Sequence, residues 1–161
     1  MSRFDNEVRV TIPILDRLLD YEPEISHEPV ASRSKSLRQL KQSVMRDLEW
    51  LLNTRQKVDG IPSDLTEVNR SVVAYGLPDF TTINHKNPAD QNRIRRTIES
   101  AIAFFEPRLE DVIVTIESSS ETQRLMRFRI DARLKVDPAP EPVTFDTTLQ
   151  LTSGQYSLKE T

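Results

Sequence analysis

The sequence contains little glycine, no cysteine and two histidines, and each shortage excludes a class of function. Its three glycines in 161 residues stand far apart, which excludes a P-loop or dinucleotide-binding turn built from closely spaced glycines. Without cysteine there is no disulfide, thiolate metal site or cysteine nucleophile. His27 and His85 do not stand at metal-ligand spacing from each other or from a carboxylate cluster. We therefore expect no metal, no cofactor and no catalytic residues.

Long apolar runs are also absent. No stretch approaches the roughly 20 apolar residues of a membrane span, and the first residues carry mixed charge without the apolar centre of a secretion signal. We therefore expect a cytoplasmic protein without membrane insertion. The net charge of −3 and the pI near 5.5 argue against a dedicated nucleic-acid binder.

The charge that is present divides the chain near residue 30. Residues 1–30 carry three basic and seven acidic side chains, whereas residues 31–60 carry seven basic and three acidic ones. A short amphipathic helix is expected at about 14–20, with Pro13 in its first turn. The polar segment 22–36 contains two prolines and has no periodicity, which indicates a tether. We predict a flexible N-terminal arm over 1–35 and a single domain over 36–161.

Two long helices are predicted in that domain. The first runs from about Ser36, its expected N-cap, to residue 55, because apolar residues recur there at spacings of three and four. The second begins at Asn87, a capping residue followed by proline, and ends at residue 105. A shorter helix over 65–75 is expected to end at Gly76 in a left-handed conformation. The stripe of the first helix consists of Leu37, Leu40, Val44, Leu48, Leu51 and Leu52.

The periodicity changes to two after residue 110. Alternating segments at 111–117, 126–136 and 143–151, with a short last one through Leu158, predict strands joined by turns. Helices followed by such a meander predict an α+β fold, in which helices pack on one face of a small antiparallel sheet and are preceded by the N-terminal helical arm.

Trp50, the single tryptophan, lies away from the apolar stripe of its helix on a helical wheel, near Arg46. Two interpretations are open. A loop within residues 61–80 covers the indole, which is the simpler interpretation, or the indole anchors another protein, because tryptophan and arginine are enriched in binding hot spots.

The triplet Glu106-Pro107-Arg108 ends the second long helix, because Pro107 biases Glu106 away from helical geometry. Spacing alone favours a structural role, in which the two charges cap the helix or pair with neighbours. A rigid polar corner on an interface is the alternative. Glu106 is also a candidate general acid for glycoside cleavage, but Arg108 is expected to keep it ionised.

Basic residues alternate along the 126–136 strand. A nucleic-acid surface is one interpretation of them, although no aromatic residues are interleaved for base stacking. Pairing with acids on neighbouring strands is the favoured one. The basic residues are Arg127, Arg129, Arg133 and Lys135, and the expected partners are Asp111, Glu117 and Asp146.

Five segments follow one another in an order typical of one protein family. They are Leu15-Asp16-Arg17-Leu18-Leu19, Asp47 to Arg55, Tyr75-Gly76-Leu77-Pro78-Asp79-Phe80, Phe105-Glu106-Pro107-Arg108-Leu109 and Phe128-Arg129-Ile130. The chain resembles the TssE family of type VI secretion baseplate subunits, related to the lysozyme-like wedge protein of contractile-tail phages. The resemblance extends from about Ile14 to Leu158, and no single motif decides it.

The resemblance implies a structural role. Members of this family join the baseplate proteins TssF, TssG and TssK at the inner membrane and seed the contractile sheath of TssB and TssC. It assigns Glu106, Pro107 and Arg108 to an interface. The lysozyme label implies no hydrolase here, because no convincing acid pair is present.

Further expectations concern how the protein binds its partners. We expect an added strand at a sheet edge bordered by 143–159, so that proline at Thr147 or Ser157 leaves a folded monomer that fails to nucleate sheath. We also expect the 14–20 helix to dock on a partner through apolar residues. The alternative function is a small regulatory binding protein like the anti-adaptor IraD, which has a similar fold. The apolar residues are Leu15, Leu18 and Leu19.

Overall fold

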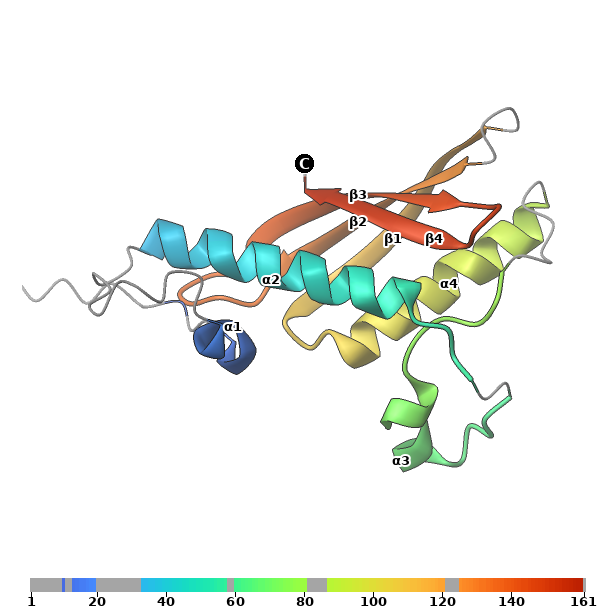
Figure 1. The fold of residues 1–161 in the computed structure, drawn as a ribbon, viewed down its shortest axis with the longest axis horizontal. Helices are drawn as coiled ribbons and strands as arrows, with labels where there is room; N and C mark the ends of the chain where they lie inside the picture. The colour runs from blue at the N-terminus through green and yellow to red at the C-terminus, as the bar shows by residue number, and fades with distance from the viewer. Residues whose placement is uncertain are drawn as a thin grey trace, which may run out of the picture.

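A computed structural model of the protein describes residues 10, 13–19, 33–57, 60–80, 87–120 and 125–160. Its centre is a four-stranded antiparallel sheet with the strands in chain order. The strands are β1 (Leu109–Ser120), β2 (Leu125–Leu134), β3 (Glu141–Gln150) and β4 (Gln155–Glu160). Two long helices, α2 (Arg33–Asn53) and α4 (Pro88–Phe105), lie against one face of the sheet (Figure 1). The predicted α+β class is confirmed.

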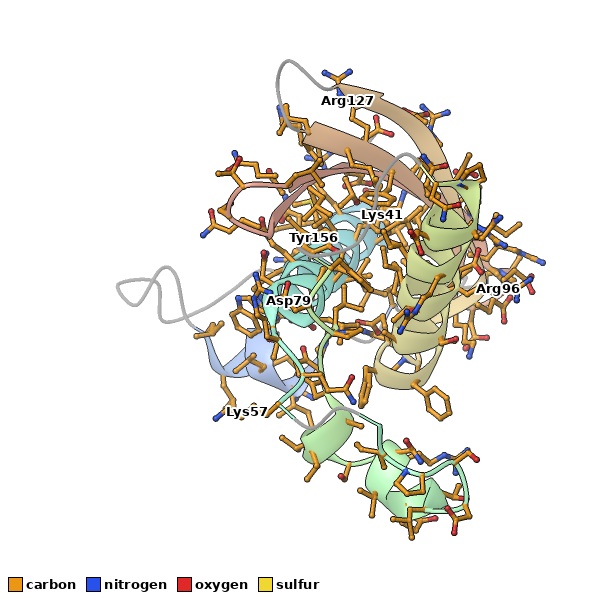
Figure 2. All side chains as sticks on the ribbon, turned by 90° about the vertical axis from the view of Figure 1, so that its right-hand side faces the viewer. Lys41, Lys57, Asp79, Arg96, Arg127 and Tyr156 are labelled. Atoms are coloured by element: carbon orange, nitrogen blue, oxygen red, sulfur yellow. The ribbon has the colours of Figure 1, made fainter. Side chains whose placement is uncertain are left out.

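The core lies between the sheet and these helices. Alternate residues of β2 and β3 point into it, as the period of two predicts, and the stripes of α2 and α4 cover them. Phe128, Ile130 and Phe145 are at most 1% exposed. The opposite sheet face carries charged side chains, and Figure 2 shows Arg127 on the side of the sheet away from the helices.

The charged sheet face confirms the predicted pairing of the basic strand. Arg129 lies 2.7 Å from Glu117 on β1 and 3.4 Å from Asp146 on β3. Arg133 lies 3.4 Å from Asp111. These contacts cross between strands, so part of the basic stripe is neutralised within the sheet.

Helix α2 begins earlier than expected, at Arg33, so the prediction of Ser36 as its N-cap is wrong. Ser36 is 7% exposed and lies inside the helix. Arg33 at the helix start donates a hydrogen bond of 2.8 Å to the Asp137 carbonyl, which ties this end to the connection after β2. That long-range contact has no local sequence signal.

Helix α4 follows its prediction closely. The Asn87 side chain accepts a hydrogen bond of 3.0 Å from the Ala89 N–H, with Pro88 in the first turn. Its buried residues are Ile94, Ile98 and Ile102.

The described residues 60–80, which follow α2, form a lobe that projects away from the sheet (Figures 1 and 2). It contains two short helices, α3 (Thr66–Asn69) and the 3-10 helix η1 (Val72–Ala74), instead of the single helix expected over 65–75. The Ser71 side chain accepts a bond from the Val73 N–H and starts η1 separately. This cap explains why the helix is interrupted.

Gly76 joins the lobe to the end of α2. Its φ of +105° has the predicted positive sign, but η1 already ends at Ala74, so its role is not that of a helix terminator. A Cβ at this position would lie 2.4 Å from the Thr54 carbonyl oxygen. Glycine therefore permits the Leu77 N–H to donate to that oxygen at 2.8 Å.

The N-terminal arm is described at residue 10 and in the segment 13–19, where α1 (Ile14–Leu18) lies beside α2 (Figure 1). Most of the predicted tether, together with His27 and His85, lies outside the described residues. Among the helices that the structure describes, none is long and apolar enough to cross a membrane.

Candidate functional site

The site begins at the corner where α4 turns into β1. Glu106 is the C-cap of α4, and its N–H donates to the Ile102 carbonyl at 2.9 Å. Its side chain is almost fully buried, and both carboxylate oxygens accept hydrogen bonds from Arg108. One of these bonds, from Nε to Oε1, measures 2.6 Å. Pro107 stands between the two charges and is exposed.

Arg108 extends this corner to α2. Its Nη1 donates to the Ser43 hydroxyl at 3.1 Å, and its Nη2 donates to Asp47 Oδ2 at 2.6 Å. Burial lowers the pKa of Arg108, but the bonds to Glu106 and Asp47 outweigh it and raise the pKa above its ordinary value. The structure therefore shows the structural role predicted for Glu106 and Arg108, in which the two charges pair with each other and with neighbouring side chains.

A second arginine continues the network to the arm. Arg46 donates from Nη1 to Asp16 of α1 at 2.6 Å and from Nη2 to Asp47 at 3.0 Å. Its guanidinium also lies 5.3 Å from the centre of the Trp50 ring, in the range of cation–π contacts. The hydrogen bond to Asp16 is the main cause that raises the pKa of Arg46.

Trp50 is 55% exposed, so the interpretation that a loop covers it is wrong. It borders a groove whose other walls come from the corner and the lobe. The Tyr75 and Phe105 rings in this groove meet edge to face at 5.2 Å between centroids. The lining residues are Pro13, Asp47, Trp50, Leu51, Tyr75, Phe105, Glu106, Pro107 and Arg108. We call this the corner groove.

The structure brings together most of the expected interface residues but not the leucines of α1. Trp50, Pro107 and Arg108 line the corner groove, and Arg46 stacks on Trp50. Leu15, Leu18 and Leu19 are 46%, 76% and 42% exposed, and α1 buries none of its residues.

Sequence reasoning did not find the acids that bind the two arginines. Asp47 lies beside Arg46 in the sequence, but its bond to Arg108 spans 61 residues. Asp16 lies on a different element from its partner Arg46. One local signal was present: Arg46 and Asp47 follow Ser43 by three and four residues, so the three side chains lie on the same face of the helix.

The network holds its side chains in fixed positions: both Glu106 oxygens accept hydrogen bonds from Arg108, so this carboxylate acts as an ion-pair partner. Within the described residues no group of three or more histidine or acidic side chains could hold a metal ion.

The edges of the sheet form the second candidate surface. β4 and β1 are its two edges, whereas β3 lies between β2 and β4. Thr147 is 2% exposed and pairs with Phe128 on one side and Leu158 on the other. The expectation that Thr147 borders an open edge is therefore wrong, and Ser157 on β4 is the edge residue of the two.

Comparison with known proteins shows the family of the chain. A family model matches residues 38–139, more than half of the chain, and the class it defines is that of structural baseplate components. The chain belongs to the family described as Baseplate wedge protein gp25. The matched region contains Arg46, Trp50 and the whole Glu106–Arg108 corner.

No curated protein matches the chain. A chain in a solved structure, "The baseplate complex from the type VI secretion system", is similar at 21% identity, with a TM-score of 0.49, over 70% of this chain and 96% of that one.

Proposed function

We propose that the protein is the TssE-type subunit of a type VI secretion baseplate, a cytoplasmic component of a particle docked at the inner membrane. Membership of the wedge family and the ordered segments of its sequence support this proposal. Its role is structural: it binds TssF and TssG in the wedge with TssK nearby, and it anchors the sheath of TssB and TssC. It is not a hydrolase, so the pure protein is expected to release no fragments from peptidoglycan.

The corner groove is the proposed wedge-binding surface. The observation that carries this proposal is the arginine pair: Arg108 is fixed by Glu106 and Asp47, and Arg46 is fixed over an exposed Trp50. Side chains held in place before binding lose less conformational entropy when a partner arrives. Indole and guanidinium groups are also the usual centres of binding energy in interfaces.

Copurification with TssF and TssG tests this surface, and the chain offers a matched control. Phe104 on α4 is 54% exposed and lies under Arg70 at 5.9 Å, so its setting resembles that of Trp50 at a different site. Trp50→Ala is expected to abolish copurification, and Phe104→Ala is expected to retain it. Equal recovery of TssF and TssG with both variants would reject the corner groove.

The sheath is proposed to begin at the β4 edge, where another chain can add a strand to unpaired backbone groups. The α1 helix is proposed as an additional contact, because its leucines are exposed. Deleting residues 1–30 should then weaken wedge association while the domain from residue 36 stays folded, and an unchanged affinity would remove α1 from the interface.

A further inference from the structure

One side chain of α2 occupies the outer edge of β4. Asn53, the last residue of the helix, donates from Nδ2 to the Tyr156 carbonyl at 3.0 Å and accepts at Oδ1 from the Tyr156 N–H at 2.8 Å. The same Nδ2 also donates to the Glu49 carbonyl at 2.9 Å, which holds the amide in place. Asn53 thus makes with Tyr156 both bonds that a residue of a fifth strand would make.

These bonds fix which groups of β4 face outward. In an antiparallel pair the backbone groups of successive residues point alternately toward and away from the partner strand. Because the N–H and C=O of Tyr156 point to Asn53, those of Leu158 and Glu160 also point outward. Ser157 and Lys159 bond to β3, where they pair with Thr148 and Asp146.

The outward positions are self-complementary. If a second copy of β4 pairs antiparallel about Leu158, then Leu158 faces its own equivalent and Tyr156 faces Glu160 of the other copy. All three outward positions become hydrogen-bonded, and no two like charges stand opposite each other. A two-fold axis of this kind is the commonest symmetry of homodimers.

The geometry of β4 is regular, and its first half is open to one side. A polar hollow borders Gln155 to Ser157 next to the end of α2, and the pairing of β4 with β3 contains no bulge. Lining residues from the two sides include Glu49, Asn53, Arg55, Gln155 and Ser157.

The other edge is closed by different means. Glu99 of α4 accepts the Val114 N–H on β1 at 3.0 Å and is itself held by Arg95. β1 also contains two register shifts, one of them beside Asp111 with φ of +52°. Bulges and inserted charges both hinder strand pairing at a sheet edge. Self-pairing is therefore expected at β4 and not at β1.

We propose that the β4 edge is a latent self-pairing surface that Asn53 keeps closed against a second copy of this chain. By occupying Tyr156 on each copy, Asn53 removes two of the three bonded pairs, because Tyr156 of one copy is the partner of Glu160 of the other. One pair at Leu158 remains, which is too little to hold two chains. This surface is the edge at which the sheath is proposed to begin, but self-pairing of the purified chain does not require that role.

Sedimentation of the purified chain over a concentration series tests the proposal. Wild type is expected to stay monomeric, and Asn53→Ala is expected to self-associate at least about tenfold more tightly, since each copy regains a bonded pair. Asn69→Ala is the matched control, because the Asn69 amide likewise donates to two carbonyls, of Pro62 and Leu65, at a site away from the sheet. It should remain monomeric.

Two further measurements keep the test decisive. Hydrogen exchange should show the Tyr156 amide protected in wild type and fast in dilute Asn53→Ala, with the Ser157 and Lys159 amides protected in both, which also shows that β4 is folded. Adding Glu160→Pro to Asn53→Ala removes an outward N–H and should restore the monomer. A folded Asn53→Ala that stays monomeric, or a dimer that persists with Glu160→Pro, overturns the proposal.

Discussion

Arg108 and Asp47 join the two long helices of the protein at one point: the Nη2 of Arg108, just beyond α4, lies 2.6 Å from Oδ2 of Asp47 in the middle of α2. The same guanidinium bonds both oxygens of Glu106, which is 3% exposed. A charge buried to this extent is tolerated only with a bonded partner. Arg108 therefore supports the fold as well as the proposed interface.

Replacing Arg108 is expected to lower stability. Arg108→Ala leaves Glu106 buried without its partner and should lower the free energy of unfolding by about 2–3 kcal/mol. This is less than the usual cost of breaking a fully buried ion pair, because Arg108 is only partly buried. Chemical denaturation measures this. Arg133→Ala is the control: its pair with Asp111 is half exposed and should contribute less than about 0.5 kcal/mol. Equal losses in the two variants would contradict the role given to Arg108.

Docking of α1 is expected to depend on the charge of Asp16. Burial raises the pKa of Asp16, but the nearby Ser43 hydroxyl and the hydrogen bond from Arg46 outweigh it and leave the pKa below its ordinary value of 3.8. A lowered acid pKa stabilises the docked state above the ordinary value, and that contribution disappears as the pH falls through the lowered one. The contact should therefore persist from neutral pH to about pH 4 and be lost in stronger acid.

Fluorescence of Trp50 reports this contact, because it is the single tryptophan and Arg46 links it to Asp16. Asp16→Asn should change the emission at neutral pH without changing the helix content seen by circular dichroism. Asp90→Asn, in the first turn of α4, should leave the emission unchanged. An Asp16→Asn spectrum identical to wild type would show that α1 does not hold Arg46 on the indole.

Gly76 and Gly60 should respond differently to alanine, although both have positive φ. Gly60→Ala meets no atom within 4 Å and should cost about 1–2 kcal/mol for the backbone conformation alone. Gly76→Ala also forces its Cβ against the Thr54 carbonyl at 2.4 Å and should cost about 3–5 kcal/mol. Thermal unfolding of the two variants separates these effects, and a smaller loss at Gly76 would contradict the close approach.

Proline scanning should separate the interior strand from the edge strand. Thr147→Pro breaks β3 between two neighbours and is expected to prevent folding. Glu160→Pro removes an outward N–H of β4 and should leave a folded monomer that fails to nucleate sheath from TssB and TssC. Folding is checked by circular dichroism, and normal sheath assembly with a folded Glu160→Pro would exclude this edge as the template.

Local patterns predicted the elements well. The period of two in β2 and β3 gave the buried faces, and Asn87 with Pro88 gave the start of α4, because these signals act within a few residues. The lobe was harder, since Ser71 interrupts a segment whose pattern is helical. Gly76 was identified as a positive-φ residue, but its closeness to Thr54 depends on how the lobe returns to α2.

Less of the site was predictable, because its contacts join distant segments. Glu106 and Arg108 were recognised as a corner, whereas Asp47 and Asp16 have no sequence pattern that links them to an arginine. The prediction that a loop covers Trp50 is wrong because the lobe projects away from α2. The predicted meander has this same strand order, which places β3 inside the sheet, so of the segment 143–159 expected at an edge only the part in β4 lies there.

The strand order also has a consequence for biosynthesis. Each strand pairs with its neighbour in sequence, so the sheet and α4 can form by local steps that fold quickly. α2 is different: its contact with β4 joins Asn53 to Tyr156 across 103 residues. On the ribosome, α2 leaves the exit tunnel long before β4, so the part of its apolar stripe that packs near β4 stays uncovered until that strand has been made.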